Sequence, residues 1–181
     1  MIFVTVGSWG FNSLVKAADD LGDAITSELI IQIANGSYKP VNCEYFKTAS
    51  SLDPYYDNAT LVIAHGGTGT TLEVLAKGVP LVSISNPSVK DNHQHEFLLA
   101  LHKVDALNYC EDLSELEEIV KRTQKRTEHF DVSIFFNGFT ADIDSYQPER
   151  KSSMTKAIRN LFKKTPTLKS KEIELSQIKN C

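Results

Sequence analysis

A glycine-rich corner follows a short apolar run in the middle of the chain, and these two features together could bind an anion. The run, residues 61–64, is typical of a parallel strand buried on both faces. The corner consists of His65, Gly66, Gly67, Thr68 and Gly69. Its glycines let the backbone approach a ligand closely, and the helix expected to follow offers unpaired N–H groups and a positive dipole end. We therefore predict a phosphate or diphosphate site at this 65–69 corner.

Two well-known phosphate signatures do not fit the 65–69 corner. A Walker A loop requires Gly-Lys-Ser/Thr, which does not follow, and a dinucleotide fingerprint requires a third glycine where Leu72 stands. The alternative interpretation is a tight strand-to-helix connection whose glycines serve packing alone. A second corner, Gly7 and Ser8, ends the strand-like residues 2–6. Open α/β sheets place their ligand crevice at such strand ends.

The elements around the corners alternate between strand-like and helix-like segments, which predicts an α/β, Rossmann-like parallel sheet with flanking helices. Expected strands are residues 2–6, 29–33, 44–47, 61–64, 81–84 and 106–109. Expected helices are residues 12–21, 52–58, a segment ending at Gly78, one starting near Asp91, 113–126 and 148–164. Residues 130–147 fit neither pattern. We expect a Rossmann-like domain over residues 1–147, suited to a nucleotide ligand, and a separate basic helix and tail over 148–181.

Composition places the chain among globular proteins without a membrane span. Its 181 residues are 41% hydrophobic and 23% charged, and no basic, apolar leader follows Met1. Three cysteines without CxxC spacing favour reduced thiols in a cytoplasmic protein over a zinc site. We expect no cofactor, no metal and no nucleic-acid partner.

The net charge of −4 is unevenly distributed. Residues 148–171 hold eight basic residues and one acidic residue, so this stretch is strongly positive and the remainder strongly negative. An apolar stripe of Met154, Ile158, Leu161 and Phe162 lies opposite the basic residues on the expected helix. This segment could dock a partner, or it could pack on its own domain with a solvated basic face.

Three blocks in order carry a resemblance: FVTVGS, HGGTGTTLEVLAKGVPLV and KDNHQHEFLLALHKVDAL. Over about residues 1–126 the chain resembles the glycosyltransferase family 28 C-terminal domain. It is most similar to the stand-alone subunits of dolichyl-linked N-acetylglucosamine transferases and of PssE-type exopolysaccharide transferases, and to the donor half of MurG. The chain departs from the pattern of this family at two places. The family usually has His-Ala-Gly-Ala-Gly at the 65–69 corner, and Gly-Thr is more common where this chain has Gly7-Ser8-Trp9-Gly10.

The resemblance implies the donor-binding half of a GT-B glycosyltransferase. The expected reaction is inverting, metal-free transfer of a hexose or N-acetylhexosamine from a UDP-sugar to a lipid-linked acceptor. A membrane-anchored, PssD-like partner would bind the acceptor and supply the general base, so no catalytic residue is assigned to this chain. We expect this complex at the cytoplasmic membrane face.

The resemblance also implies roles for individual residues. Gly7, Ser8 and the 65–69 corner would bind the nucleotide diphosphate, with His65 either touching it or merely ending the strand. Glu73 would accept hydrogen bonds from the ribose hydroxyls, although Thr70 and Glu73 also fit a helix capping box. The donor sugar would be bound by Asn92, His93 and Gln94.

The histidines near this segment invite a metal interpretation, which helical geometry disfavours. His93 and His95 would point about 200° apart on a helix. We therefore expect no shared metal ion, and we expect His95 and His102 on the surface.

Two alternative functions for the whole chain are a regulatory, dehydrogenase-like Rossmann module and an interaction subunit that has lost ligand binding. The dehydrogenase reading lacks G-x-G-x-x-G after the first strand.

Overall fold

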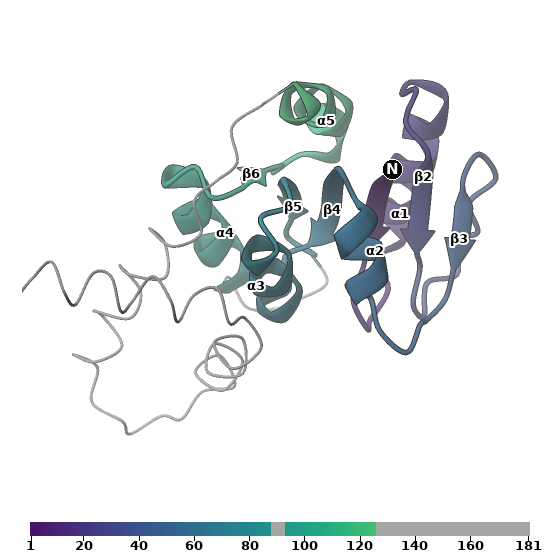
Figure 1. Cartoon of the computed structure of the whole chain (residues 1–181), viewed down its shortest axis with the longest axis horizontal. Coiled ribbons are helices and arrows are strands. Elements are labelled where there is room, and N and C mark those ends of the chain that lie inside the picture. The colour runs from purple at the N-terminus through teal and green to yellow at the C-terminus, as the bar shows by residue number, and fades with distance from the viewer. Residues whose placement is uncertain (88–92, 126–181) are drawn as a thin grey trace, which may run out of the picture. The chain divides into compact units, whose positions relative to one another are not determined.

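The computed structural model describes residues 1–87 and 93–125, which form strands and helices in alternation (Figure 1). The strands are β1 (Ile2–Thr5), β2 (Leu29–Gln32), β3 (Glu44–Phe46), β4 (Leu61–His65), β5 (Leu81–Ile84) and β6 (Asn108–Tyr109). The α-helices are α1 (Asn12–Asp20), α2 (Asp53–Asn58), α3 (Thr68–Ala76), α4 (His93–Lys103) and α5 (Leu116–Gln124). Short 3₁₀ helices, Leu21–Asp23 and Leu113–Glu115, extend α1 and precede α5.

The strands form one six-stranded parallel sheet in the order β3-β2-β1-β4-β5-β6. The chain builds outward from β1 to β3 and then returns to place β4 on the other side of β1. Sequence order therefore reverses between β1 and β4. In doubly wound sheets this reversal opens the ligand crevice at the carboxyl ends of the two strands. The predicted Rossmann-like fold is confirmed.

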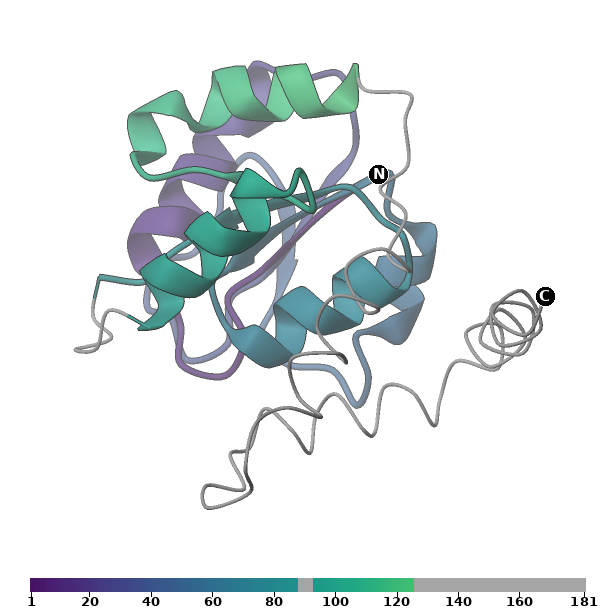
Figure 2. The same cartoon turned by 90° about the vertical axis from the view of Figure 1, so that its left-hand side faces the viewer.

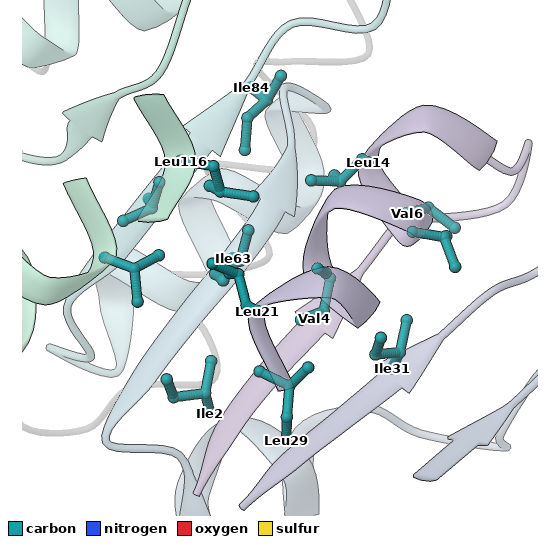
Figure 3. Close-up of a cluster of buried hydrophobic side chains, with 14 of the residues drawn as sticks. Ile2, Val4, Val6, Leu14, Leu21, Leu29, Ile31, Ile63, Ile84 and Leu116 are labelled. Carbon is teal, nitrogen blue, oxygen red and sulfur yellow. The ribbon is translucent and has the colours of Figure 1, made fainter. Parts of the chain in front are cut away.

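The sheet is covered on both faces, which explains why its strands read as continuous apolar runs. On one face, Ile2, Val4 and Ile63 pack against Leu14 of α1 and Leu116 at the start of α5 (Figure 3). Helices α2 and α3 lie on the opposite face (Figure 2).

An aromatic cluster fills part of that opposite face. The ring of Phe3 stacks on Tyr55 with 4.9 Å between centroids and meets Tyr56 edge-on at 5.7 Å. Phe46 stacks on Tyr55 at 4.7 Å. Stacked and edge-on aromatic pairs add stability beyond the area they bury. The cluster thus ties α2 to β1 and β3.

Element boundaries match the sequence-based ones closely, with a few differences. Gly78 ends α3 as predicted: its φ is +68° and its N–H donates to the Leu75 carbonyl at 2.9 Å. The last strand is shorter than residues 106–109, because the Ala106 N–H donates to the Leu101 carbonyl of α4 at 3.0 Å and pairing with β5 begins at Asn108. The basic segment 148–181 and the unassigned residues 130–147 lie outside the described residues.

Candidate functional site

The two predicted corners lie side by side at the carboxyl edge of the sheet. Thr5, the last residue of β1, is in register with Ala64 of β4, so Gly7, just after β1, and His65, the last residue of β4, lie at neighbouring strand ends. This is the place where the strand order reverses. Residues 58 positions apart in sequence are thereby brought into one candidate site.

The imidazole of His65 lies between the two corners. A Cβ built on Gly7 or on Gly67 would overlap the ring, so both positions leave no room for a side chain. Gly7 also has φ +66°, a conformation that favours glycine. Burial lowers the pKa of His65, which keeps the ring neutral at pH 7. The geometry gives His65 a packing role that holds the corners together.

The 65–69 corner leads directly into α3, as the sequence predicts. The Gly67 carbonyl accepts the first helical bond, from Thr71 N–H at 3.0 Å, and Gly67, as the N-cap residue, has no side chain to cap this end of α3. The N–H groups of the first turn therefore point past the helix end, where they suit an anion. Gly69 is exposed, and a Cβ built there would meet nothing within 4 Å.

The other two glycines of the corner are required by packing. A Cβ on Gly66 would lie 2.8 Å from Leu98 Cδ1 and 3.4 Å from Gln94 Oε1. The packing alternative thus accounts for Gly66 and Gly67. Gly69 is the glycine of this corner that packing does not explain.

Gln32, which the sequence analysis did not single out, holds the 7–8 corner in place. At the end of β2, its Oε1 accepts from Thr5 Oγ1 at 2.7 Å and from Val6 N–H at 3.2 Å. Its Nε2 donates to the carbonyls of Gly7 at 2.9 Å and Lys47 at 3.1 Å. The amide is only 4% exposed, so these bonds fix the corner firmly. A glutamine inside the apolar run 29–33 was the available signal.

Glu73 is exposed on the second turn of α3. The alternative of a capping box does not hold, because α3 begins at Thr68 with Gly67 as its N-cap, which leaves Thr70 inside the helix. The tight turn at Gly67, whose N–H donates to the His65 carbonyl at 2.8 Å, starts the helix earlier than the pattern indicates. The carboxylate also lies near Tyr56, whose pKa is raised by burial and further by Glu73.

Gln94, in the first turn of α4, lies beside the 65–69 corner. Its Oε1 accepts from Asn86 N–H at 3.1 Å and approaches Gly66. With the oxygen engaged, Nε2 is the part of this amide that can donate to a ligand. His93 begins α4, and Asn92 lies outside the described residues. The structure thus brings Gln94 to the predicted diphosphate site.

His95 and His102 are both partly exposed, and each also makes a hydrogen bond to the segment that carries β6. His95 Nδ1 lies 2.8 Å from the hydroxyl of Tyr109. His102 Nδ1 lies 3.1 Å from the Leu107 carbonyl. Both histidines tie α4 to the segment that carries β6, a pairing between elements that helical periodicity alone does not reveal.

A pocket of about 290 Å³ adjoins the 7–8 corner. Its lining residues are Trp9, Gly10, Phe11, Asn12, Ser13, Asn35, Gly36 and Pro87. Trp9 is 88% exposed at its rim.

Among residues 1–87 and 93–125, no cluster of three His, Cys, Asp or Glu side chains could hold a metal ion. No helix within those ranges is long and apolar enough to cross a membrane.

Glycosyltransferases are among the solved structures that this fold resembles. SsfS6 from Streptomyces sp. SF2575, complexed with thymidine diphosphate, aligns with a TM-score of 0.55 at 20% identity over 70% of this chain and 33% of its own. MurG from Acinetobacter baumannii aligns with a TM-score of 0.51 at 20% identity over 67% of this chain and 40% of its own. At these identities the likeness concerns the fold.

Proteins found by sequence comparison have a higher identity to this chain than these solved structures do. The UDP-N-acetylglucosamine transferase subunit ALG13 of Homo sapiens is 40% identical over 60% of this chain, and its Candida albicans counterpart is 38% identical over 41%. The matched regions span 11% and 25% of those relatives, so this chain corresponds to a small part of the human protein. Residues 1–133 match the family described as the glycosyltransferase family 28 C-terminal domain. That match covers more than half of the chain, which therefore belongs to this family.

Proposed function

We propose that this chain is the donor-binding subunit of an inverting glycosyltransferase that uses a UDP-sugar and works with an acceptor-binding partner. The observation that carries the proposal is the meeting of the 7–8 and 65–69 corners where the strand order reverses. There the uncapped start of α3 faces the same edge of the sheet. The names of the relatives, UDP-N-acetylglucosamine transferase subunits, support N-acetylglucosamine as the sugar.

The site suits the leaving group of such a reaction. The acceptor oxygen would form a bond to the anomeric carbon while the bond from that carbon to the diphosphate oxygen breaks, and UDP would leave with the electron pair. The charge that develops on the diphosphate would be stabilised by backbone N–H groups of the 65–69 corner, by Ser8 and by the α3 dipole.

Glu73 and Gln94 would bind the two ends of the donor. A carboxylate on α3, one turn beyond the corner, can accept hydrogen bonds from both ribose hydroxyls. The Gln94 amide, held beside Gly66, can donate to a sugar oxygen. His93 and Asn92 are proposed to contact the sugar as well.

No catalytic base is assigned to this chain, and a partner would supply it. The general base must take the proton from the acceptor hydroxyl as the new bond forms. A donor half alone leaves its sugar open to water. We therefore propose that a membrane-associated chain closes the site and presents a lipid-linked acceptor.

A thermal-shift series tests the nucleotide assignment. UDP and UDP-N-acetylglucosamine should stabilise the full-length chain, by about 2.7 kcal/mol at 100 times the dissociation constant. GDP and NAD serve as matched controls and should stabilise it far less. Adding EDTA should change nothing, because the proposed site uses N–H and hydroxyl groups. A preference for NAD, or UDP binding that EDTA abolishes, would contradict the proposal.

A transfer assay separates the enzyme from a nucleotide-binding regulatory module. The chain should transfer sugar from UDP-N-acetylglucosamine to a lipid-linked acceptor only when its acceptor-binding partner is present. A regulatory module would bind UDP and yet transfer nothing with any partner. Efficient transfer by the chain alone would contradict the two-subunit proposal.

A further inference from the structure

The hydroxyl of Tyr109 joins two elements that border the proposed sugar site. It lies 3.0 Å from Ser85 Oγ, directly after β5, and 2.8 Å from Nδ1 of His95, in the first turn of α4. Tyr109 is only 7% exposed, and its ring meets the His95 ring edge-on at 5.6 Å. The hydroxyl is thus a fixed bridge between the end of β5 and the start of α4.

A second bond runs parallel to this bridge. Asn86, the residue after Ser85, donates its N–H to Oε1 of Gln94, the residue before His95. Two consecutive residues after β5 are therefore linked to two consecutive residues of α4, Ser85 to His95 through Tyr109 and Asn86 to Gln94 directly. Rotation or sliding of the first turn of α4 would break both links together.

The base of the bridge is itself anchored in the sheet. Tyr109 is in register with Ser83 of β5, and the next residue, Cys110, donates its N–H to the Ser83 carbonyl at 2.9 Å. The backbone of Tyr109 therefore cannot shift without breaking strand pairing. Through its hydrogen bond to His95, the hydroxyl holds the first turn of α4 at a fixed place relative to β6.

We propose that Tyr109 is a positioning residue for the sugar end of the donor and acts through Gln94. The bridge fixes the α4 turn that carries Gln94, whose amide lies against Gly66 with Nε2 left to donate. The chemical group recognised would be an oxygen of the donor sugar, a hydroxyl or an acetamido carbonyl. The inference rests on the proposed function and adds a residue that does not touch the ligand.

Calorimetry with two ligands tests the inference on the full-length chain. Tyr109→Phe keeps the ring and removes the bridge, so it should weaken binding of UDP-N-acetylglucosamine about three- to tenfold, the range of one net hydrogen bond. Binding of UDP, which lacks the transferred sugar that Gln94 would meet, should keep its wild-type affinity. A merely structural role would weaken both ligands together.

A matched control removes an equivalent hydroxyl elsewhere. Tyr38 donates to Asp19 at 2.9 Å on the far side of α1, so Tyr38→Phe should lower stability and leave both affinities unchanged. His95→Leu should reproduce the effect of Tyr109→Phe. His95→Asn should restore binding, because its amide can still bond the tyrosine hydroxyl.

Coupling to Gln94 gives the deciding result. In a chain that already carries Gln94→Ala, adding Tyr109→Phe should cause no further loss of UDP-N-acetylglucosamine affinity. Additive losses, or equal losses for UDP and the UDP-sugar, would overturn the positioning role while the proposed function stands. Should the unsubstituted chain bind neither ligand, the proposed function fails and this inference fails with it.

Discussion

Gly69 differs from the other glycines of its corner because open space surrounds the place where a side chain would lie. Glycine inside a helix costs about 0.5–1 kcal/mol relative to alanine. Neither helical propensity nor packing therefore favours glycine at this exposed position of α3. Under the proposed function, close approach of the diphosphate to the backbone would account for it.

We predict that Gly69→Ala makes the free chain more stable and the complex weaker. The melting temperature without ligand should rise, in line with a gain of up to about 1 kcal/mol. The affinity for UDP should fall, because the new methyl group occupies the space of the diphosphate. Opposite changes in stability and binding cannot come from misfolding. An unchanged UDP affinity would place the diphosphate elsewhere.

Glu73 can now be tested for ribose binding without the competing cap role. We predict that Glu73→Gln leaves the melting temperature nearly unchanged, because the side chain is exposed and the N-cap position of α3 is Gly67, not Thr70. UDP affinity should fall clearly. The wild-type chain should also bind UDP more tightly than 2′-deoxy-UDP, and the variant should lose most of that preference. Equal discrimination in both chains would refute the assignment.

Features that depend on consecutive residues could be predicted from the sequence. Apolar runs and glycines identified both corners, because a strand end and a tight turn are encoded by neighbouring residues. Gln32 was missed because its bonds reach Thr5 and Lys47, which are distant in the sequence. The partners of His95 and Tyr109 were hidden for the same reason.

At the scale of elements, Asp19 fastens α1 to the segment that follows β2. Although fully buried, its carboxylate accepts from Asn42 N–H at 2.8 Å, Val41 N–H at 3.0 Å and Tyr38 hydroxyl at 2.9 Å. Burial acts to raise the pKa of Asp19, and these hydrogen bonds outweigh it, so the pKa lies below the ordinary value of 3.8. The ionised carboxylate therefore stabilises the fold.

The sign of the pH dependence follows from that lowered pKa. The contribution of Asp19 is complete above the ordinary value of 3.8 and is lost as the pH falls below it, through the folded-state pKa. We predict that Asp19→Asn lowers the free energy of unfolding at pH 7 by about 1.5–3 kcal/mol. Urea titrations from pH 7 down to pH 3 should show a smaller acid loss in the variant. Asp20→Asn, at the exposed neighbour, is the control. An equally steep acid loss in the Asp19 variant would contradict this role.

Helices and strands were predictable where the pattern of apolar residues fits only one kind of element. The strands buried on both faces are continuous apolar runs, and the glycine stop after α3 is a single-residue signal. Helix starts were less predictable, since they depend on the preceding turn. Residues expected to be one helix over 113–126 begin as a 3₁₀ turn, in which Asp112 accepts from Ser114 N–H at 2.9 Å.

At the scale of the whole molecule, the family match ends at residue 133, before the basic segment 148–181. We predict that a chain ending at Gln147 still folds and binds UDP with wild-type affinity. Association with the acceptor-binding partner and transfer to a lipid-linked acceptor should both be lost. Circular dichroism, UDP calorimetry and co-purification with the partner measure the three properties. Unfolding of the shortened chain would mean that the segment belongs to the core.

The exposed side chain of Trp9 has a practical consequence, because it is the single tryptophan of the chain. Its ring already lies in water in the folded protein, at 88% exposure, so unfolding should change its fluorescence little. It stands two residues after Gly7, on the rim of the neighbouring pocket. A nucleotide or a partner that covers this rim should shift the emission to shorter wavelengths or quench it. Trp9 fluorescence in the unlabelled protein should therefore report occupancy of the site while responding little to denaturation.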